Sequence, residues 1–148
     1  MKLDHVLLTT DLSEEARRAY APVAELAREN GARLTLLHVV VDVRVAPHGA
    51  PLAPPLTSPD VGDQLEAARA ALAVERELID PDLDVELVAV AGGDVPEAIA
   101  EHAARSGADL IALSTHGRAG FRRLILGSVA EAVLHHAHVP VLCFPRPA

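Results

Sequence analysis

The chain has 148 residues, of which half are hydrophobic, and a formal net charge of −8 at pH 7. This length suits one domain with a substantial buried core, so we expect a single domain over residues 1–148. The negative charge opposes binding to a phosphate backbone, and one Tyr, two Phe and no Trp leave little surface for stacking on bases. We therefore expect no binding to nucleic acid.

The composition also bears on the compartment. Cys143 is the only cysteine, which excludes an internal disulfide, and its apolar neighbours indicate a buried side chain without chemistry. No apolar run approaches the roughly 18 residues of a membrane span. Residues 1–5 do not resemble the start of a signal peptide. The sequence predicts a cytoplasmic protein with no membrane partner.

Short apolar runs alternate with helical patterns along the whole chain. We expect a first strand at residues 6–10 and then a helix, which a capping box of Asp11 with Glu14 would begin. Gly31 is a suitable end for that helix. Pro22 lies inside it and would either kink the helix or begin it anew.

The same alternation continues beyond this helix. A second strand at residues 33–40 is almost continuously apolar, as in a buried parallel sheet. Five prolines in residues 45–59 prevent a helix or a central strand, so we expect a flexible surface loop there. The remaining expected elements are helices at 60–79, 95–106 and 128–137 and strands at 84–91, 108–113 and 139–144.

This order of elements predicts an α/β fold. Strands and helices in strict alternation form a single doubly wound parallel sheet, here five-stranded, with helices on both faces. Pro140 has no N–H to donate, so it belongs at a strand start or on a sheet edge. Ligands of such sheets bind at the carboxyl ends of the strands.

A glycine-bounded stretch follows the expected fourth strand. Ser114 and Gly117 open it and Gly127 closes it, with nine residues between the two glycines. The helix that follows offers free N–H groups and the positive end of its dipole to an anion. The stretch therefore predicts a loop that holds the phosphate of a nucleotide. It has no Walker lysine and is not a P-loop.

Short strings along the whole chain resemble the universal stress protein family. They are Thr-Thr-Asp-Leu-Ser at 9–13, Leu-His-Val at 37–39, Ser-Thr-His-Gly-Arg at 114–118, Leu-Gly-Ser-Val-Ala-Glu at 126–131 and Val-Pro-Val-Leu at 139–142. The resemblance implies a flavodoxin-like, Rossmann-like sheet in the order 3-2-1-4-5 and, in one branch of the family, a bound ATP. It also implies a homodimer, for which we expect the apolar edge strand from Val139 to Phe144.

One position departs from the pattern of the ATP-binding branch. That pattern is Gly-x-x-Gly, nine residues, and then Gly followed by Ser or Thr. Gly117, Gly127 and Ser128 match it, but Ser114 stands at the first glycine. A serine adds a Cβ and a hydroxyl where the backbone would approach a ligand, and it could also hydrogen-bond a ribose or phosphate oxygen. Both outcomes stay open.

The resemblance also implies where a nucleotide would lie. Asp11, with Thr10 beside it, would contact the nucleoside, and the backbone of Val39 would contact adenine. The phosphates would lie along the glycines and the start of the last helix, where Arg118 could neutralise their charge. The expected ligand-binding residues are Thr10, Asp11, Val39, Ser114, Gly117, Arg118, Gly127, Ser128 and Val129.

Several of these residues also have a purely structural interpretation. Ser128 and Glu131 form a Ser-x-x-Glu capping box, which alone would explain both. The glycines could be turn residues only. Three histidines near the last helix end indicate a solvated helix terminus rather than a metal site, so no protein-held metal is expected. These are His135, His136 and His138.

The leading hypothesis is an ATP-binding homodimer that acts as a stress-response regulator or sensor, with Mg²⁺ held through the phosphates. No nucleophile or base has a positioned partner in the sequence, so we expect no enzyme, and slow ATP hydrolysis remains a third hypothesis. The alternative is a nucleotide-independent interaction module. It would have lost ATP through Ser114 and would bind protein partners with residues 45–59.

Overall fold

The computed structural model describes residues 1–42, 60–115, 126–145 and 147. Within these ranges one parallel sheet has the strand order β3-β2-β1-β4-β5, which confirms the expected fold class and order. The predicted proline-rich loop lies outside the described residues. The strands are β1 (His5–Thr9), β2 (Arg33–Val41), β3 (Val85–Gly92), β4 (Leu110–Ser114) and β5 (Val141–Phe144).

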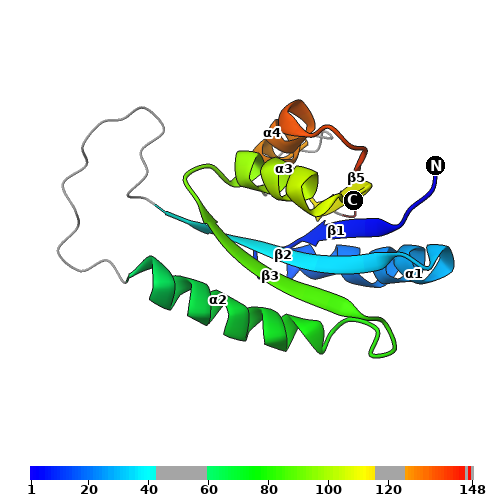
Figure 1. Cartoon of the computed structure of the whole chain (residues 1–148), viewed down its shortest axis with the longest axis horizontal. Coiled ribbons are helices and arrows are strands. Elements are labelled where there is room, and N and C mark those ends of the chain that lie inside the picture. Colours follow the sequence, from blue (N-terminus) through cyan, green and yellow to red (C-terminus); the bar gives the residue numbers. More distant parts are fainter. Residues whose placement is uncertain (43–59, 116–125, 146, 148) are drawn as a thin grey trace.

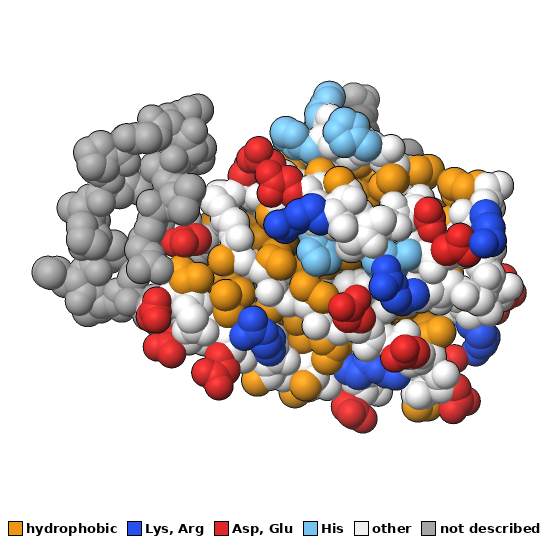
Figure 2. Space-filling view, in the orientation of Figure 1, with side chains coloured by type: hydrophobic (Ala, Val, Ile, Leu, Met, Phe, Trp, Pro, Cys, Tyr) orange, Lys and Arg blue, Asp and Glu red, His pale blue; other side chains and the backbone are white. Residues whose placement is uncertain are grey.

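Helices cover both faces of the sheet (Figure 1). The 3-10 helix η1 (Glu15–Ala19), α1 (Tyr20–Asn30) and α2 (Val61–Arg76) lie on one face. On the other lie α3 (Val95–Ser106) and α4 (Ser128–His136). In the same view β3 forms the front edge of the sheet. Apolar side chains gather near the middle of the molecular surface that faces the viewer (Figure 2).

Strand β2 shows how the sequence makes two cores. Successive side chains of a strand point to opposite faces. Leu34 and Leu36 pack with α1 and α2, whereas Leu37 and Val39 pack with α3 and α4, and all four are buried. The continuous apolar run of this strand therefore serves both layers at once.

Glycines end two helices as the sequence predicts. Gly31 follows α1 with φ +63° and Gly107 follows α3 with φ +68°. This left-handed conformation is costly for other residues, so a glycine is a reliable sign of a helix end. At the start of α3 the Asp94 side chain accepts a 3.0 Å hydrogen bond from the Glu97 amide.

The predicted capping box of Asp11 with Glu14 is wrong. Asp11 Oδ1 instead accepts from the amide of Ser13 at 3.0 Å, and Ser13 Oγ accepts from the amide of Ala16 at 3.2 Å. Glu14 contributes no side-chain cap. Leu12, between Asp11 and Ser13, adopts a left-handed conformation with φ +67° in this turn.

The structure also settles the role of Pro22. A 3-10 helix comes first, and α1 begins at Tyr20, so Pro22 lies in the first turn of the α-helix. The absent N–H of a proline is tolerated in that turn. The helix therefore begins anew and is not kinked.

Strand β5 forms the second edge of the sheet. It begins at Val141 and not at residue 139. Pro140 has no N–H to donate, although its carbonyl accepts from the Ile111 amide at 3.0 Å just before the strand starts. Cys143 on this strand is half-buried and not fully buried as expected, and partial burial raises the pKa of its thiol. Over the described ranges no helix is both long and apolar enough to cross a membrane.

Candidate functional site

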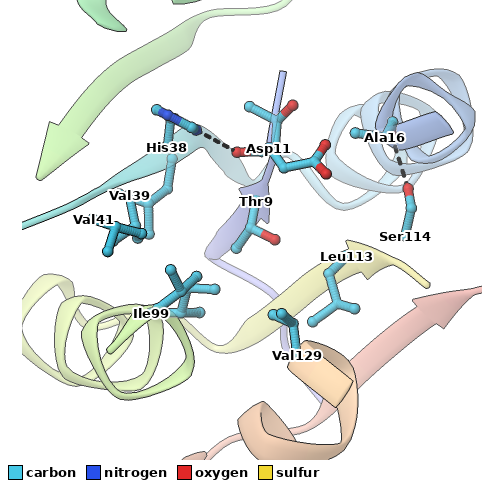
Figure 3. A pocket seen from close by; sticks show the side chains of 13 residues that line it. Thr9, Asp11, Ala16, His38, Val39, Val41, Ile99, Leu113, Ser114 and Val129 are labelled. Carbon is cyan, nitrogen blue, oxygen red and sulfur yellow. Dashed lines mark hydrogen bonds between the residues drawn. The ribbon is translucent and has the colours of Figure 1, made fainter. Parts of the chain in front are cut away.

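A pocket of about 300 Å³ opens at the carboxyl end of the sheet (Figure 3). It collects residues from the ends of β1, β2 and β4 and from the amino-terminal parts of α3 and α4. This is where ligands of open α/β sheets bind. The lining residues are Thr9, Thr10, Asp11, Ala16, Leu37, His38, Val39, Val41, Val95, Ile99, Leu113, Ser114 and Val129.

One wall of the pocket is apolar. Val39 and Val41 extend from β2, and Ile99 faces them from α3, with Val129 of α4 close by (Figure 3). Val129 is 43% exposed although it is a large apolar side chain. A wall of this kind beside a polar rim suits a ligand with a flat apolar part and a polar part.

The polar rim begins at the end of β1. Thr10 is fixed there by its backbone, because its amide donates to the Leu37 carbonyl at 2.9 Å and its carbonyl lies 2.8 Å from His38 Nδ1. A carbonyl oxygen only accepts, so the imidazole must carry its proton on Nδ1. The next residue, Asp11, brings a carboxylate to the rim, and its contact with Ser13 orients that carboxylate.

Ser114 lies at the end of β4. Its hydroxyl donates a 3.0 Å hydrogen bond to the carbonyl of Ala16 in η1. Figure 3 shows the side chain directed toward η1. The hydroxyl that replaces the first motif glycine is thus engaged with the protein itself.

The start of α4 lies beside the pocket, and the predicted capping box of Ser128 with Glu131 is wrong. Gly127 is the N-cap, no side chain caps the helix, and Ser128 is its first residue. The first intrahelical bond runs from the Glu131 amide to the Gly127 carbonyl at 3.0 Å. The amides of residues 128–130 therefore come before the first intrahelical hydrogen bond and have no acceptor within the helix. Amides in this position bind anions at helix N-termini.

The structure brings most of the predicted ligand-binding residues to one place. Five of them line the pocket, namely Thr10, Asp11, Val39, Ser114 and Val129. Gly127 and Ser128 directly precede Val129 at the start of α4. Gly117 and Arg118 lie outside the described residues, so their predicted roles stay predictions.

Sequence reasoning missed part of the lining. His38 occurs in one of the strings that carried the family resemblance but was given no role. Val95 and Ile99 of α3 lie one helical turn apart, just after the end of β3. Such spacing is a signal for one helix face, but it indicates core packing as readily as a binding wall.

The described residues offer no ready-made metal site. Nowhere in the ranges 1–42, 60–115 and 126–145 do three His, Cys, Asp or Glu side chains come together to hold a metal ion. His135 and His136 lie exposed in the last turn of α4, as expected of a solvated helix end. A cation at the pocket would need oxygen ligands from a bound molecule beside Asp11.

The chain is similar to known proteins over nearly its whole length. The model of the universal stress protein family matches residues 2–145. "Universal stress protein A homolog 1" of Coxiella burnetii is 32% identical over 142 residues, covering 96% of each chain. "Universal stress protein MJ0531" of Methanocaldococcus jannaschii is 49% identical over 49 residues, which span 33% of this chain and only 29% of that protein.

Solved structures show the same fold. Universal stress protein UspA from Lactobacillus plantarum superposes with a TM-score of 0.73 at 23% identity, covering 97% of this chain and 99% of that one. A universal stress protein in complex with cAMP gives a TM-score of 0.66 at 21% identity, over 99% and 100% of the two chains. The Archaeoglobus fulgidus protein in complex with dAMP gives 0.62 at 22%, over 97% and 98%. By sequence and by fold, the chain belongs to the universal stress protein family.

Proposed function

We propose that the chain binds an adenine nucleotide in the pocket at the carboxyl end of the sheet, and that this nucleotide is ATP. The observation that carries the proposal is the combination, around one pocket, of an apolar wall, the Asp11 carboxylate and the N-terminus of α4. These three features match the base, the ribose and the phosphates in chemistry. The complexes of two structural neighbours with cAMP and dAMP support the adenine nucleotide class.

Each part of the ligand has a suitable partner. The adenine ring would lie against Val39, Ile99 and Val129, where burial of its faces is favourable. The Asp11 carboxylate would accept a hydrogen bond from a ribose hydroxyl, since an ionised carboxylate only accepts. The phosphates would lie at the amides of residues 128–130, and Mg²⁺ would be held mainly by phosphate oxygens.

The triphosphate would also meet positive charge. Arg18 of η1 reaches the end of β4, where its Nη2 donates to the Thr115 carbonyl at 3.2 Å. This bond places a guanidinium beside Thr115, the residue that follows Ser114 of the pocket lining. A cation at this position favours a ligand with several negative charges over a neutral nucleoside.

The same proposal includes a cytoplasmic homodimer that acts as a regulator or sensor and not as an enzyme. The support for the dimer is β5, a half-buried apolar strand at the edge of the sheet. A strand edge offers N–H and C=O groups for pairing with a second chain. Protein partners of the dimer would then distinguish the nucleotide-bound form from the nucleotide-free form.

The alternative of a nucleotide-independent module rested on Ser114. The hydrogen bond from its hydroxyl to Ala16 weakens that argument, because the side chain is turned toward η1. Loss of ATP binding therefore has no evident cause among the described residues of the pocket. The alternative becomes an outcome of the binding experiment.

Equilibrium dialysis of the purified protein against labelled ATP with Mg²⁺ tests the proposal. We expect saturable binding of one nucleotide per chain, weakened at least tenfold in Asp11→Ala, the equivalent of a lost charge-assisted hydrogen bond. GTP is the matched control ligand, and we expect weaker binding for it. No binding of ATP, AMP or cAMP at millimolar concentration would refute the proposal and favour the interaction module.

A further inference from the structure

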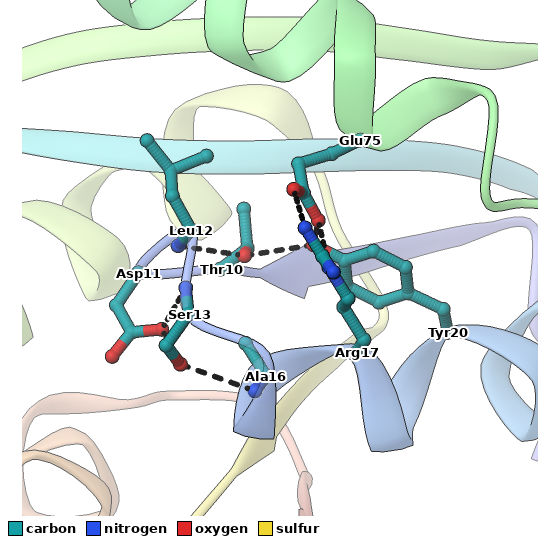
Figure 4. Close-up of polar contacts among 8 residues, drawn as sticks. All are labelled: Thr10, Asp11, Leu12, Ser13, Ala16, Arg17, Tyr20 and Glu75. Carbon is teal, nitrogen blue, oxygen red and sulfur yellow. Dashed lines mark hydrogen bonds and ion pairs between the residues drawn. The ribbon is translucent and has the colours of Figure 1, made fainter.

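A buried chain of polar groups lies directly behind the rim of the pocket (Figure 4). The Tyr20 hydroxyl of α1 lies 2.8 Å from Thr10 Oγ1 and 2.8 Å from Glu75 Oε2 of α2. Arg17 of η1 donates to both oxygens of Glu75, at 2.8 and 3.1 Å. Tyr20, Glu75 and Thr10 are only 2%, 4% and 6% exposed.

The direction of each hydrogen bond follows from chemistry. Arg17 holds the pKa of the Glu75 carboxyl below its usual range, so Glu75 is ionised and only accepts. Tyr20 must therefore donate to Glu75, and Thr10 must donate its hydroxyl proton to the Tyr20 oxygen. Burial, followed by the bond to Glu75, raises the pKa of Tyr20, which keeps its proton in place.

This chain of bonds ends at the turn that carries Asp11. Thr10 Oγ1 also accepts a hydrogen bond from the Leu12 amide at 3.0 Å. Leu12 is the only residue other than glycine with positive φ in the described part of the chain. That conformation is unfavourable for a leucine, so it persists only where neighbouring contacts hold it. Asp11 lies between the two residues that the Thr10–Leu12 bond joins.

Neither Tyr20 nor Glu75 lines the pocket, whereas Thr10 and Asp11 do. We propose that Tyr20 and Glu75 are positioning residues for a ribose-bearing ligand. Through Thr10 they hold the turn from Thr10 to Leu12, and with it the Asp11 carboxylate, in the orientation that accepts a ribose hydroxyl. The inference rests on the proposed nucleotide binding and adds a specificity determinant that comes from α2, a different helix.

A role in stability alone would leave a different signature. The chain of bonds also joins α2 to η1 and α1, so its loss lowers the stability of the fold in either case. Stability affects all ligands alike, whereas the orientation of Asp11 affects only ligands that present the hydroxyl it contacts. The ratio of affinities for ATP and its deoxy analogues therefore separates the two roles.

The experiment compares ATP with 2′-deoxy-ATP and 3′-deoxy-ATP by isothermal titration. We expect the wild type to bind at least one analogue about tenfold more weakly than ATP, as for one lost hydrogen bond to a charged group. Tyr20→Phe keeps the buried ring and removes only the phenol oxygen. In this variant we expect ATP to weaken to the level of that analogue, and the analogue itself to change little.

Three further variants complete the experiment: one is a control for stability, and two test the Thr10 hydroxyl. Val23→Ala removes a fully buried side chain from the same helix and core without touching the polar chain, so it should lower the melting temperature and keep the ratio. Thr10→Val should bind ATP and the deoxy analogue with similar affinity, because it removes both bonds of the Thr10 hydroxyl. Thr10→Ser, which restores the hydroxyl, should recover the wild-type ratio.

Each outcome has one meaning. A wild-type ratio in Tyr20→Phe overturns the positioning role, even if that variant is less stable. A wild type that binds ATP and both analogues equally overturns it as well, because no hydroxyl would then be recognised. Failure of the wild type to bind any nucleotide refutes the proposed function itself, which is a distinguishable result.

Discussion

The hydroxyl of Ser114 donates to the carbonyl of Ala16 across 3.0 Å, joining the end of β4 to η1. Arg18 of η1 makes a second connection to the same place through the Thr115 carbonyl. A glycine at position 114 could make no such bond. The departure from the family pattern therefore corresponds to a contact within the protein, between two elements that border the pocket.

Replacement of Ser114 tests this interpretation. We expect Ser114→Gly to reduce the free energy of unfolding by about 1–2 kcal/mol, from the lost hydrogen bond and the added freedom of glycine in a strand. We expect Ser114→Ala to lose about 1 kcal/mol and to isolate the hydroxyl. Urea unfolding measures both. Tighter ATP binding by Ser114→Gly than by the wild type would instead show that the serine obstructs the site.

Substitution of Gly127 tests the phosphate position. Gly127 has φ −58° and ψ 150°, a conformation open to any residue, so a side chain there leaves the backbone unstrained. We expect Gly127→Val to weaken ATP at least tenfold by blocking the approach to the N-terminus of α4, with little change in melting temperature. Gly127→Ala, with the smallest side chain, should have a lesser effect in the same titration. Normal ATP binding by Gly127→Val would show that the phosphates lie elsewhere.

A buried histidine at the opposite end of the sheet should make the stability of the fold depend on pH. His5 is buried, and its Nδ1 lies 3.0 Å from Arg33 Nη2, a group that only donates. His5 must therefore carry its proton on Nε2, which lies 2.8 Å from Thr35 Oγ1. Thr35 in turn donates to Glu86 at 3.1 Å. The bond from Arg33 requires the neutral form of His5, because a protonated Nδ1 cannot accept.

Burial, reinforced by Arg33, lowers the pKa of His5 in the folded protein. The unfolded chain takes up the proton below about pH 6.5, whereas the folded one resists it, so acid favours unfolding. We expect the free energy of unfolding to fall between pH 7.5 and pH 5.5. Burial also lowers the pKa of His102, which contributes in the same direction. At more acidic pH the lowered pKa values of Asp109 and Glu75 continue the trend.

Urea unfolding of His5→Gln at the two pH values isolates the contribution of His5. The glutamine amide can still donate to Thr35 but does not titrate, so we expect a smaller loss of stability on acidification than in the wild type. His102 remains in the variant and accounts for part of the loss that persists. An equal or larger loss in the variant would contradict the assignment.

The dimer proposal depends on the free edge of β5. The carbonyls of Pro140 and Phe144 accept from β4, so the alternating backbone groups of Val141 and Cys143 point toward the open edge. Cys143→Pro removes the outward N–H without removing a bond to β4. We expect light scattering to show a dimer for the wild type and a monomer for this variant. A dimeric variant, or a monomeric wild type, would place the interface elsewhere or remove it.

The sequence predicted the parts of the fold that local rules decide. Gly31 and Gly107 end helices because few other residues tolerate the left-handed conformation. The residues alone predicted a ligand site at the carboxyl ends of the strands, where Thr10, Asp11 and Val39 lie, but the roles of these three residues came from the family resemblance. The strand order itself came from the family resemblance and not from the residues.

The sequence could not predict features that depend on distant partners. The left-handed Leu12 relies on Thr10, Tyr20 and Glu75, and the last of these comes from another helix. The predicted N-cap at Ser128 was wrong by one position, because Gly127 is the N-cap of α4. Neither outcome follows from a local sequence pattern.

A titration of the isotope-labelled protein with Mg·ATP, followed by amide chemical shifts, tests the central claim most directly. The account predicts saturable shifts at Thr10, Asp11 and Val39 and at the start of α4 around Val129. It predicts little change at the opposite end of the sheet, around His5. An absence of shifts at millimolar ATP, or shifts that lie away from the pocket, would contradict it.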